Sequence, residues 1–414
     1  MTVHIAPSAP CGCVAAPPSK SMAHRLLICA GLSEGTSVVR GVDLSQDVLA
    51  TLDCLRALGA GVEVEPDGTA NLVRISGADL GASAFEEVRF PCRESGSTLR
   101  FFTPLGLALG GPVTLSGTPR LLSRPLGAYE DICRGQGLYF KQRETELLVQ
   151  GPLSPGEFSL PGDVSSQFAS GLLFTLPLLS GSSLIRLAGV VESRPYISMT
   201  LDALAQFDIF AVWRDERTLF VPGRQTYLAC DVTVEGDWSN AAFFFALGDG
   251  VQVEEPTGAA PADTAPAAGD AAVDAAGGAG ADTSERPIID LADCPDLGPV
   301  AFAFAAAHRG ATFTGTRRLA LKESDRAAAM AEELAKFGVT VEVGENAVAI
   351  TPPADGLHAP AEPLSGHNDH RIVMALATLC VRVGGTITGE GAVAKSFPGF
   401  FDTLQQLGVD LHFS

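Results

Sequence analysis

One pattern of residues recurs six times along this 414-residue chain. Each copy has an apolar stretch with helical spacing, then glycine, then a short strand rich in β-branched residues, as in HRLLICAGLSEGTSVVRG from His24. The other copies begin near Thr98, Phe168, Asn240, Leu297 and Arg371, at intervals of 57 to 74 residues. Self-similarity with a period of this size marks a repeated supersecondary unit. The pattern therefore predicts six α/β units rather than a coincidental alternation of helices and strands.

A second helix and strand follow most copies of the pattern. LDCLRALGAGVEVE from Leu52 and AEELAKFGVTVEV from Ala331 each show an amphipathic helix, a glycine and an alternating strand. Glycine commonly ends a helix in the left-handed conformation, and alternation is typical of a strand with one buried face. The fourth unit lacks this second helix and instead has an acidic segment rich in alanine and glycine, about residues 256–285. We expect a flexible loop there, because the segment has little apolar bulk to bury.

The charge balance excludes several classes of partner. The formal net charge is −20, from 48 acidic and 28 basic residues. A nucleic-acid binder would carry a basic face, and an anionic membrane would repel this chain. The sequence shows neither an apolar run long enough for a membrane span nor a signal peptide. The nine cysteines lack metal-site spacing, which predicts reduced thiols in a cytoplasmic protein.

Polar motifs stand where the first three repeat helices are expected to begin. Backbone N–H groups at a helix start attract anions, and nearby Lys, Arg and hydroxyl groups add direct ligands. Helix capping explains one such motif readily, but it explains three at equivalent positions less well. The candidate residues in this half are Lys20, Ser21, Arg25, Gly96, Arg124, Ser165, Ser166, Gln167 and Ser193.

The second half repeats this arrangement with more charge. Its motifs are KESDR, NDHR and AKSFP, and an aspartate precedes the fifth repeat helix. The chain has only five lysines, and three of them lie in helix-start motifs: Lys20, Lys322 and Lys395. The other candidates here are Asp296, Glu323, Arg326 and Arg371.

Taken in order, the motifs PSKS, SGSTLR, SSQ, ESRPY, EGD, KESDR, NDHR and AKSFP resemble the 5-enolpyruvylshikimate-3-phosphate synthase family. The resemblance covers about residues 5–410, and KESDR and NDHR are specific even individually. It implies an α/β fold, a two-domain inside-out α/β barrel built from six βαβαββ repeats. The implied domains are residues 20–229, and residues 1–19 with 230–414.

The resemblance also implies a reaction. The enolpyruvyl group of phosphoenolpyruvate passes to the 5-hydroxyl of shikimate 3-phosphate, and phosphate is released by addition and elimination through a tetrahedral intermediate. This step belongs to the shikimate pathway of aromatic amino-acid biosynthesis. The resemblance implies small anionic substrates, no metal or other cofactor, and a monomer.

The matching motifs assign candidate residues to each substrate. Lys20, Ser21, Arg25, Ser165, Ser166, Gln167, Ser193, Asp296 and Lys322 are assigned to shikimate 3-phosphate. Lys20, Gly96, Arg124, Gln167, Arg326, Arg371 and Lys395 are assigned to phosphoenolpyruvate. The reaction needs an acid and a base. Asp296 is the candidate base for the 5-hydroxyl, and Lys20 or Glu323 is the candidate acid for the methylene carbon.

The sequence departs from the family motifs at two places, and two other functions are possible. Glu94 and Ser95 occupy positions where many members have Asn and Ala, and Arg318 stands where some have Asn, so no substrate contact is carried over to Arg318. One alternative is a UDP-N-acetylglucosamine enolpyruvyl transferase, but its reactive cysteine is missing from residues 116–124. The other is an inactive binding protein on the same fold, which should have lost charged positions that this chain keeps.

Overall fold

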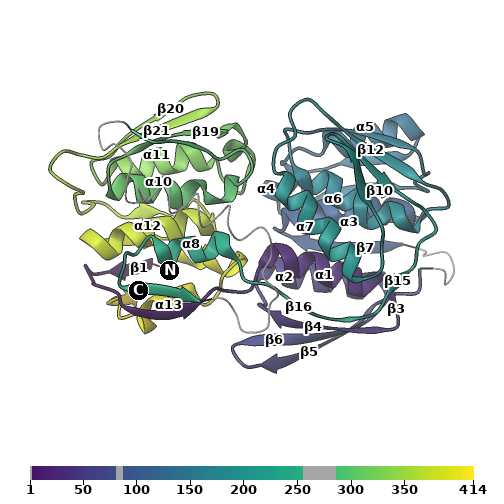
Figure 1. Cartoon of the computed structure of the whole chain (residues 1–414), viewed down its shortest axis with the longest axis horizontal. Coiled ribbons are helices and arrows are strands. Elements are labelled where there is room, and N and C mark those ends of the chain that lie inside the picture. The colour runs from purple at the N-terminus through teal and green to yellow at the C-terminus, as the bar shows by residue number, and fades with distance from the viewer. Residues whose placement is uncertain (1, 81–86, 255–285) are drawn as a thin grey trace. The chain divides into compact units, whose positions relative to one another are not determined.

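The computed structural model describes residues 2–80, 87–254 and 286–414 (Figure 1). The loop expected at residues 256–285, and with it the expected lack of a second helix in the fourth unit, lies outside these residues. The chain divides into two compact units, Pro18–Glu235 and Met1–Pro17 with Gly236–Ser414. Each unit has a hydrophobic core of its own.

Three four-stranded sheets form the Pro18–Glu235 unit. In each sheet the first two strands are parallel, and every other pair is antiparallel. The first sheet has the order β16 (Asp231–Thr233), β4 (Thr36–Val42), β6 (Ala70–Ser76), β5 (Gly61–Asp67). The second has β7 (Val88–Arg93), β8 (Pro112–Gly117), β10 (Glu146–Gln150), β9 (Tyr139–Gln142). The third has β11 (Glu157–Pro161), β12 (Ser183–Ala188), β14 (Thr218–Val221), β13 (Val212–Asp215). Two short parallel strands, β3 (Ser33–Glu34) and β15 (Tyr227–Leu228), pair separately.

The helices of this unit are of two kinds. The first helix of each repeat is buried on nearly all sides: α1 (Lys20–Leu32), α3 (Gly96–Ala108) and α6 (Ser166–Thr175). Helices that are apolar all round belong in a core. A Cβ at Gly171 of α6 would lie 2.5 Å from the carbonyl oxygen of Arg100, so glycine is what lets α6 approach α3 this closely. The remaining helices are α2 (Gln46–Leu58), α4 (Pro119–Leu122), α5 (Gly127–Gln136), η1 (Leu176–Leu178) and α7 (Arg194–Gln206).

The second unit repeats the same plan. One sheet has the order β18 (Ile288–Asp290), β19 (Ala311–Thr314), β21 (Ala347–Thr351), β20 (Thr340–Val343). Another has β22 (Leu364–Ser365), β23 (Gly385–Thr388), β1 (Thr2–Ile5), β24 (Leu411–Phe413), and β17 (Val251–Glu254) pairs with β2 (Gly12–Ala15). The helices are α8 (Trp238–Phe245), η2 (Pro295–Leu297), α10 (Gly298–Ala307), η3 (Arg317–Leu321), α11 (Arg326–Ala335), α12 (His370–Val383), η4 (Glu390–Lys395) and α13 (Phe400–Gln406).

The five four-stranded sheets among the described residues share one order, in which the strands of a repeat stand as first, second, fourth and third. Distant strands complete two of these sheets. β16 supplies the first strand beside β4 (Figure 1). β1 supplies the fourth strand beside β23. The α/β class and the repeated βαβαββ unit are confirmed. No helix in the described part of the chain is long and apolar enough to cross a bilayer.

Candidate active site

The start of α1 holds the first candidate cation. Ser19 caps this helix, since its hydroxyl accepts the N–H of Met22 at 3.2 Å. Lys20 Nζ donates to Oδ2 of Asp47 at 2.9 Å, and Asp47 lies in the first turn of α2. Both side chains are mostly buried. Asp47 therefore fixes the ammonium group of the first residue of α1.

One turn further along α1, Arg25 is buried against two neighbouring helices. Its Nε donates to the hydroxyl of Thr200 at 2.8 Å, and its Nη atoms donate to the carbonyl oxygens of Ser21 at 2.7 Å and Tyr196 at 2.9 Å. Burial lowers the pKa of Arg25 to about 10, so it stays charged at neutral pH. Among the described residues its hydrogen bonds go to neutral oxygens. The negative charge of Glu235 nearby partly offsets the cost of burying this cation.

The start of α3 holds an arginine against exposed backbone. Ser95 caps the helix by accepting the N–H of Thr98 at 3.2 Å. A Cβ at Gly96 would clash with Nη1 of Arg124 and would lie 2.8 Å from its Cζ. Glycine at this position thus lets the guanidinium lie on the first turn of the helix. A fixed guanidinium beside helix N–H groups suits a phosphate or carboxylate.

Gln167 connects the starts of α3 and α6. Its Oε1 accepts Nη1 of Arg100 at 2.6 Å, and its Nε2 donates to the hydroxyl of Ser97 at 2.9 Å. Ser165 caps α6 by accepting the N–H of Gln167 at 3.3 Å, and Ser166 is the first residue of that helix. Ser193, which is buried, precedes α7 with a left-handed φ of 56°. The unit therefore presents hydroxyl, amide and cationic groups at three helix starts.

In the other unit, Asp296 gathers three cations at the start of α10. Its Oδ1 accepts Lys322 Nζ at 3.1 Å and Arg326 Nη1 at 2.8 Å. Nη1 of Arg371 donates to the backbone oxygen of Asp296 at 2.9 Å. Four candidates from KESDR, NDHR and the fifth repeat thus meet at one place.

Arg326 is the most buried of these cations, at 1% exposed. Besides Asp296, it donates to Oε2 of Glu323 at 2.7 Å and to Oδ2 of Asp369 at 2.9 Å. Asp369 also caps α12 by accepting the N–H of Arg371 at 2.9 Å, and it accepts the Ser324 hydroxyl at 3.1 Å. The guanidinium of Arg326 therefore donates hydrogen bonds to three carboxylates in this structure. Two of them, Asp296 and Glu323, are candidates for proton transfer, and Arg326 holds both in place.

The charges of this cluster shift its pKa values. Burial alone would raise the pKa of Asp296, but Lys322, Arg371 and Arg326 hold it well below its usual range. Burial, together with the charge of Arg326, lowers the pKa of Lys322 to about 8 against the opposing effect of Asp296. Asp296 is therefore ionised at neutral pH, and Lys322 is close to losing its proton.

Lys395 lies at the end of η4 and is buried. Its Nζ donates to the backbone oxygen of Asn368 at 2.8 Å, directly before the Asp369 cap of α12. This contact ties the AKSFP and NDHR motifs together.

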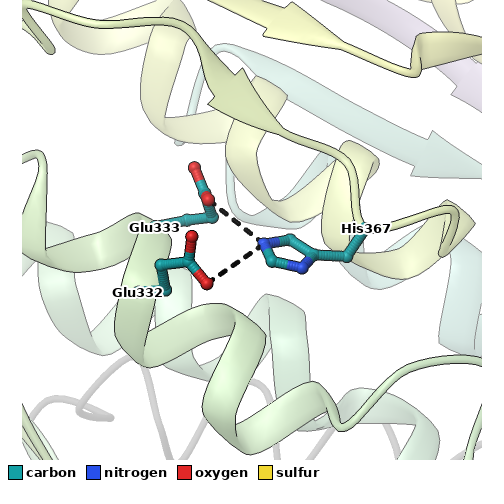
Figure 2. A group of neighbouring side chains, drawn as sticks. All are labelled: Glu332, Glu333 and His367. Carbon is teal, nitrogen blue, oxygen red and sulfur yellow. Dashed lines mark hydrogen bonds and ion pairs between the residues drawn. The ribbon is translucent and has the colours of Figure 1, made fainter.

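One group in the described part of the chain has metal-ligand residue types: Glu332, Glu333 and His367 (Figure 2). The two carboxylate oxygens of Glu333 already accept Lys336 Nζ at 3.0 and 2.8 Å. An ammonium at this place would repel a metal ion, so the donor set does not favour one.

Sequence reasoning missed three residues of these clusters: Asp47, Arg100 and Asp369. Arg100 and Asp369 lie inside the quoted motifs SGSTLR and NDHR but were given no role. Asp47 lies in the first turn of α2, ahead of the stretch from Leu52 in which this helix was predicted. Arg318, which was assigned no substrate contact, is buried and donates to the backbone oxygen of Ala292 at 2.9 Å.

Nearly the whole sequence is similar to a known protein family and to individual members of it. The family described as EPSP synthase (3-phosphoshikimate 1-carboxyvinyltransferase) matches residues 6–404. The 3-phosphoshikimate 1-carboxyvinyltransferase of Clostridium kluyveri is 37% identical over 97% of this chain and 96% of the relative. That of Clostridium perfringens is 36% identical over 98% of each.

Solved structures agree on the fold. EPSP synthase from Acinetobacter baumannii superposes with a TM-score of 0.77 at 22% identity, covering 100% of this chain and 99% of that one. The enolpyruvyl transferase NikO from Streptomyces tendae superposes with a TM-score of 0.75 at 15% identity, covering 100% of this chain and 98% of that one. With a family match over nearly the whole sequence, this chain belongs to the EPSP synthase (3-phosphoshikimate 1-carboxyvinyltransferase) family.

Proposed function

We propose that this chain transfers the enolpyruvyl group of phosphoenolpyruvate to the 5-hydroxyl of shikimate 3-phosphate and releases phosphate. The observation that carries the proposal is the meeting of Asp296, Lys322 and Arg326 through 2.8 and 3.1 Å contacts. This cluster supplies an ionised carboxylate together with cations for anionic substrates. We propose further that the two compact units are the two domains of the enzyme and that residues of both serve this reaction.

Shikimate 3-phosphate is assigned to residues at the starts of three helices, α1, α6 and α7, and to the Asp296 cluster. Hydroxyl groups and helix N–H groups suit its phosphate, and the charge of Arg25 suits its carboxylate. The 3.1 Å contact between Lys322 and Asp296 supports their assignment to a ring hydroxyl. The full set is Lys20, Ser21, Arg25, Ser165, Ser166, Gln167, Ser193, Asp296 and Lys322.

Phosphoenolpyruvate is assigned to the remaining cations. Arg124 lies on the first turn of α3 at Gly96, and Arg371 and Lys395 are fixed by backbone oxygens. Direct contact by Arg326 would require one of its three carboxylates to move. The full set is Lys20, Gly96, Arg124, Gln167, Arg326, Arg371 and Lys395.

The proton transfers follow from the charges. In the addition step the 5-hydroxyl oxygen bonds to C2 of phosphoenolpyruvate, Asp296 takes the hydroxyl proton, and Lys20 or Glu323 protonates C3. In the elimination step a C3 proton returns to the protein and the C2–O bond to phosphate breaks, while the cations stabilise the departing charge. Binding of anions beside Lys322 and Arg371 offsets their effect on Asp296, which raises its basicity when substrate is present.

The fall of kcat/KM at alkaline pH should reflect loss of the proton from Lys322. Its protonated form binds anions, and with a pKa of about 8 this form is present below pH 8 and is lost above it. We expect kcat/KM for shikimate 3-phosphate, which reports the free enzyme, to fall as pH rises through about 8. In Lys322→Arg the guanidinium keeps its proton, so this fall should disappear. An identical fall in the variant would assign it to another group.

Substituting Gly96 should weaken binding of phosphoenolpyruvate selectively. In Gly96→Ala the added methyl group must displace the Arg124 guanidinium. Loss of one charge-assisted contact should raise KM for phosphoenolpyruvate by about tenfold and leave KM for shikimate 3-phosphate near its wild-type value. Gly127→Ala is the matched control, because no atom lies within 4 Å of its added Cβ. Equal KM values in Gly96→Ala and wild type would contradict the placement of Arg124.

A phosphate-release assay with phosphoenolpyruvate and one of two acceptors tests the function. We expect phosphate with shikimate 3-phosphate and none with UDP-N-acetylglucosamine. The reverse result would identify the UDP-N-acetylglucosamine enolpyruvyl transferase. Failure with both acceptors in folded protein would favour an inactive binding protein.

We also propose a monomer that works in the cytoplasm. All nine cysteines lie among the described residues and are free thiols, which supports a reducing compartment. Light scattering should give a mass near 42.9 kDa; a dimer mass would contradict this.

A further inference from the structure

Glu333 is a fully buried carboxylate on α11, two turns after Arg326. A buried carboxylate is costly unless donors surround it. Lys336 Nζ donates to both of its oxygens, the backbone N–H of Ser365 donates to Oε2 at 2.9 Å, and Nε2 of His367 lies 3.1 Å from Oε1 (Figure 2). Two of these three partners belong to the turn that leads into α12.

The Ser365–Asp369 turn has an unfavourable backbone. His367 and Asn368 are consecutive residues in the left-handed region, with φ of 48° and 53°. Residues other than glycine seldom adopt this backbone conformation, so surrounding contacts must maintain it. Within the turn, His367 N–H donates to the Ser365 hydroxyl at 3.2 Å and Asp369 N–H donates to the Gly366 oxygen at 2.9 Å. Two residues of α11 add contacts from outside the turn: Glu333 at Ser365 and His367, and Arg326 at Asp369.

The turn carries groups that the proposed reaction uses. The oxygen of Asn368 accepts Lys395 Nζ, and Asp369 both caps α12 and accepts Arg326. Arg371 follows in the first turn of α12. A shift of the turn would therefore move two cations assigned to phosphoenolpyruvate.

We propose that Glu333 is a positioning residue for enolpyruvyl transfer: it fixes the Ser365–Asp369 turn and, through that turn, Lys395 and Arg371. This inference rests on the proposed function, because it takes these two cations as ligands of phosphoenolpyruvate. Glu333 itself touches neither cation. Its contribution is to substrate binding through geometry.

Glu333→Gln tests the proposal, with Glu332→Gln as the matched control. Both changes remove one negative charge from α11, but Glu332 is 64% exposed and lies 3.9 Å from His367. We expect Glu333→Gln to raise KM for phosphoenolpyruvate about tenfold, with little change in KM for shikimate 3-phosphate. The control should match wild type. Unchanged KM values in Glu333→Gln, or equal losses for both substrates, would overturn the proposal.

A second pair of variants covers the case in which Glu333→Gln does not fold. His367 is partly exposed, so changes there are better tolerated. His367→Gln keeps a donor for Glu333 and should stay near wild type, whereas His367→Leu removes it and should raise KM for phosphoenolpyruvate about fivefold. Equal KM values in these two variants would overturn the proposal.

Lys395→Met, measured in the same assay, separates this inference from the function beneath it. A raised KM for phosphoenolpyruvate in Lys395→Met supports the assignment of that cation. If KM then stays normal in Glu333→Gln and His367→Leu, the positioning role alone fails. If Lys395→Met itself has a normal KM, the assignment of Lys395 fails first.

Discussion

Replacing Asp296 with asparagine should lower kcat by about a thousandfold, the effect expected for loss of a general base. In the structure this carboxylate accepts Lys322 and Arg326 and is ionised at neutral pH, since these cations and Arg371 hold its pKa well below its usual range. An amide of the same size cannot take the proton of the 5-hydroxyl. Steady-state kinetics with both substrates measures the change.

Asp290→Asn is the control for this prediction. Asp290 lies six residues earlier, is exposed, and uses Oδ1 to accept the N–H of Ala292, which an asparagine oxygen can also do. We expect its kcat to match wild type. A kcat within tenfold of wild type in Asp296→Asn would move the base role to another group, with Glu323 as the next candidate.

Replacing Arg326 with glutamine should be the most destabilising single change in this cluster. The guanidinium donates to Asp296, Glu323 and Asp369, and Asp369 is completely buried. Removing one partner of a buried ionic group leaves uncompensated charge and costs about 3–5 kcal/mol. The free energy of unfolding and the Tm, measured on variant and wild type at one pH, test this.

Two further variants define the cause of that loss. Arg134→Gln removes an exposed arginine that also pairs with two acids, Glu130 and Asp131, and should change stability by less than about 1 kcal/mol. Arg326→Lys keeps the charge but loses the forked donors, so it should remain destabilised. Wild-type stability in Arg326→Gln would show that the three carboxylates do not depend on this cation.

The sequence predicted local elements well because their signals are local. Apolar spacing and polar helix starts located the first helix of every repeat, which begin at Lys20, Gly96, Ser166, Trp238, Gly298 and His370. Local signals did not predict that strands from distant parts of the chain complete two of the sheets. β16 completes the sheet of β4, and β1 completes the sheet of β23, because pairing between distant segments leaves no periodic trace in either one.

The candidate site shows the same division. Motifs located charged residues at helix starts, but they carry no information on where a side chain points. That Arg326 faces three carboxylates, or that Arg124 lies across Gly96, follows only from packing. Asp47, which holds Lys20, was missed because it lies before Leu52, where the predicted helix began, and no motif marks it.

The reaction carried out in D₂O tests the proposed chemistry most directly. In the tetrahedral intermediate C3 is a methyl group, and in D₂O one of its three hydrogens is a deuteron delivered by the catalytic acid, which has exchanged with the solvent. Proton NMR of the product should therefore show deuterium in the vinyl methylene of a large fraction of the molecules, with one phosphate released per product. Formation of the product with no deuterium in that methylene, or no product from shikimate 3-phosphate at all, would contradict the account.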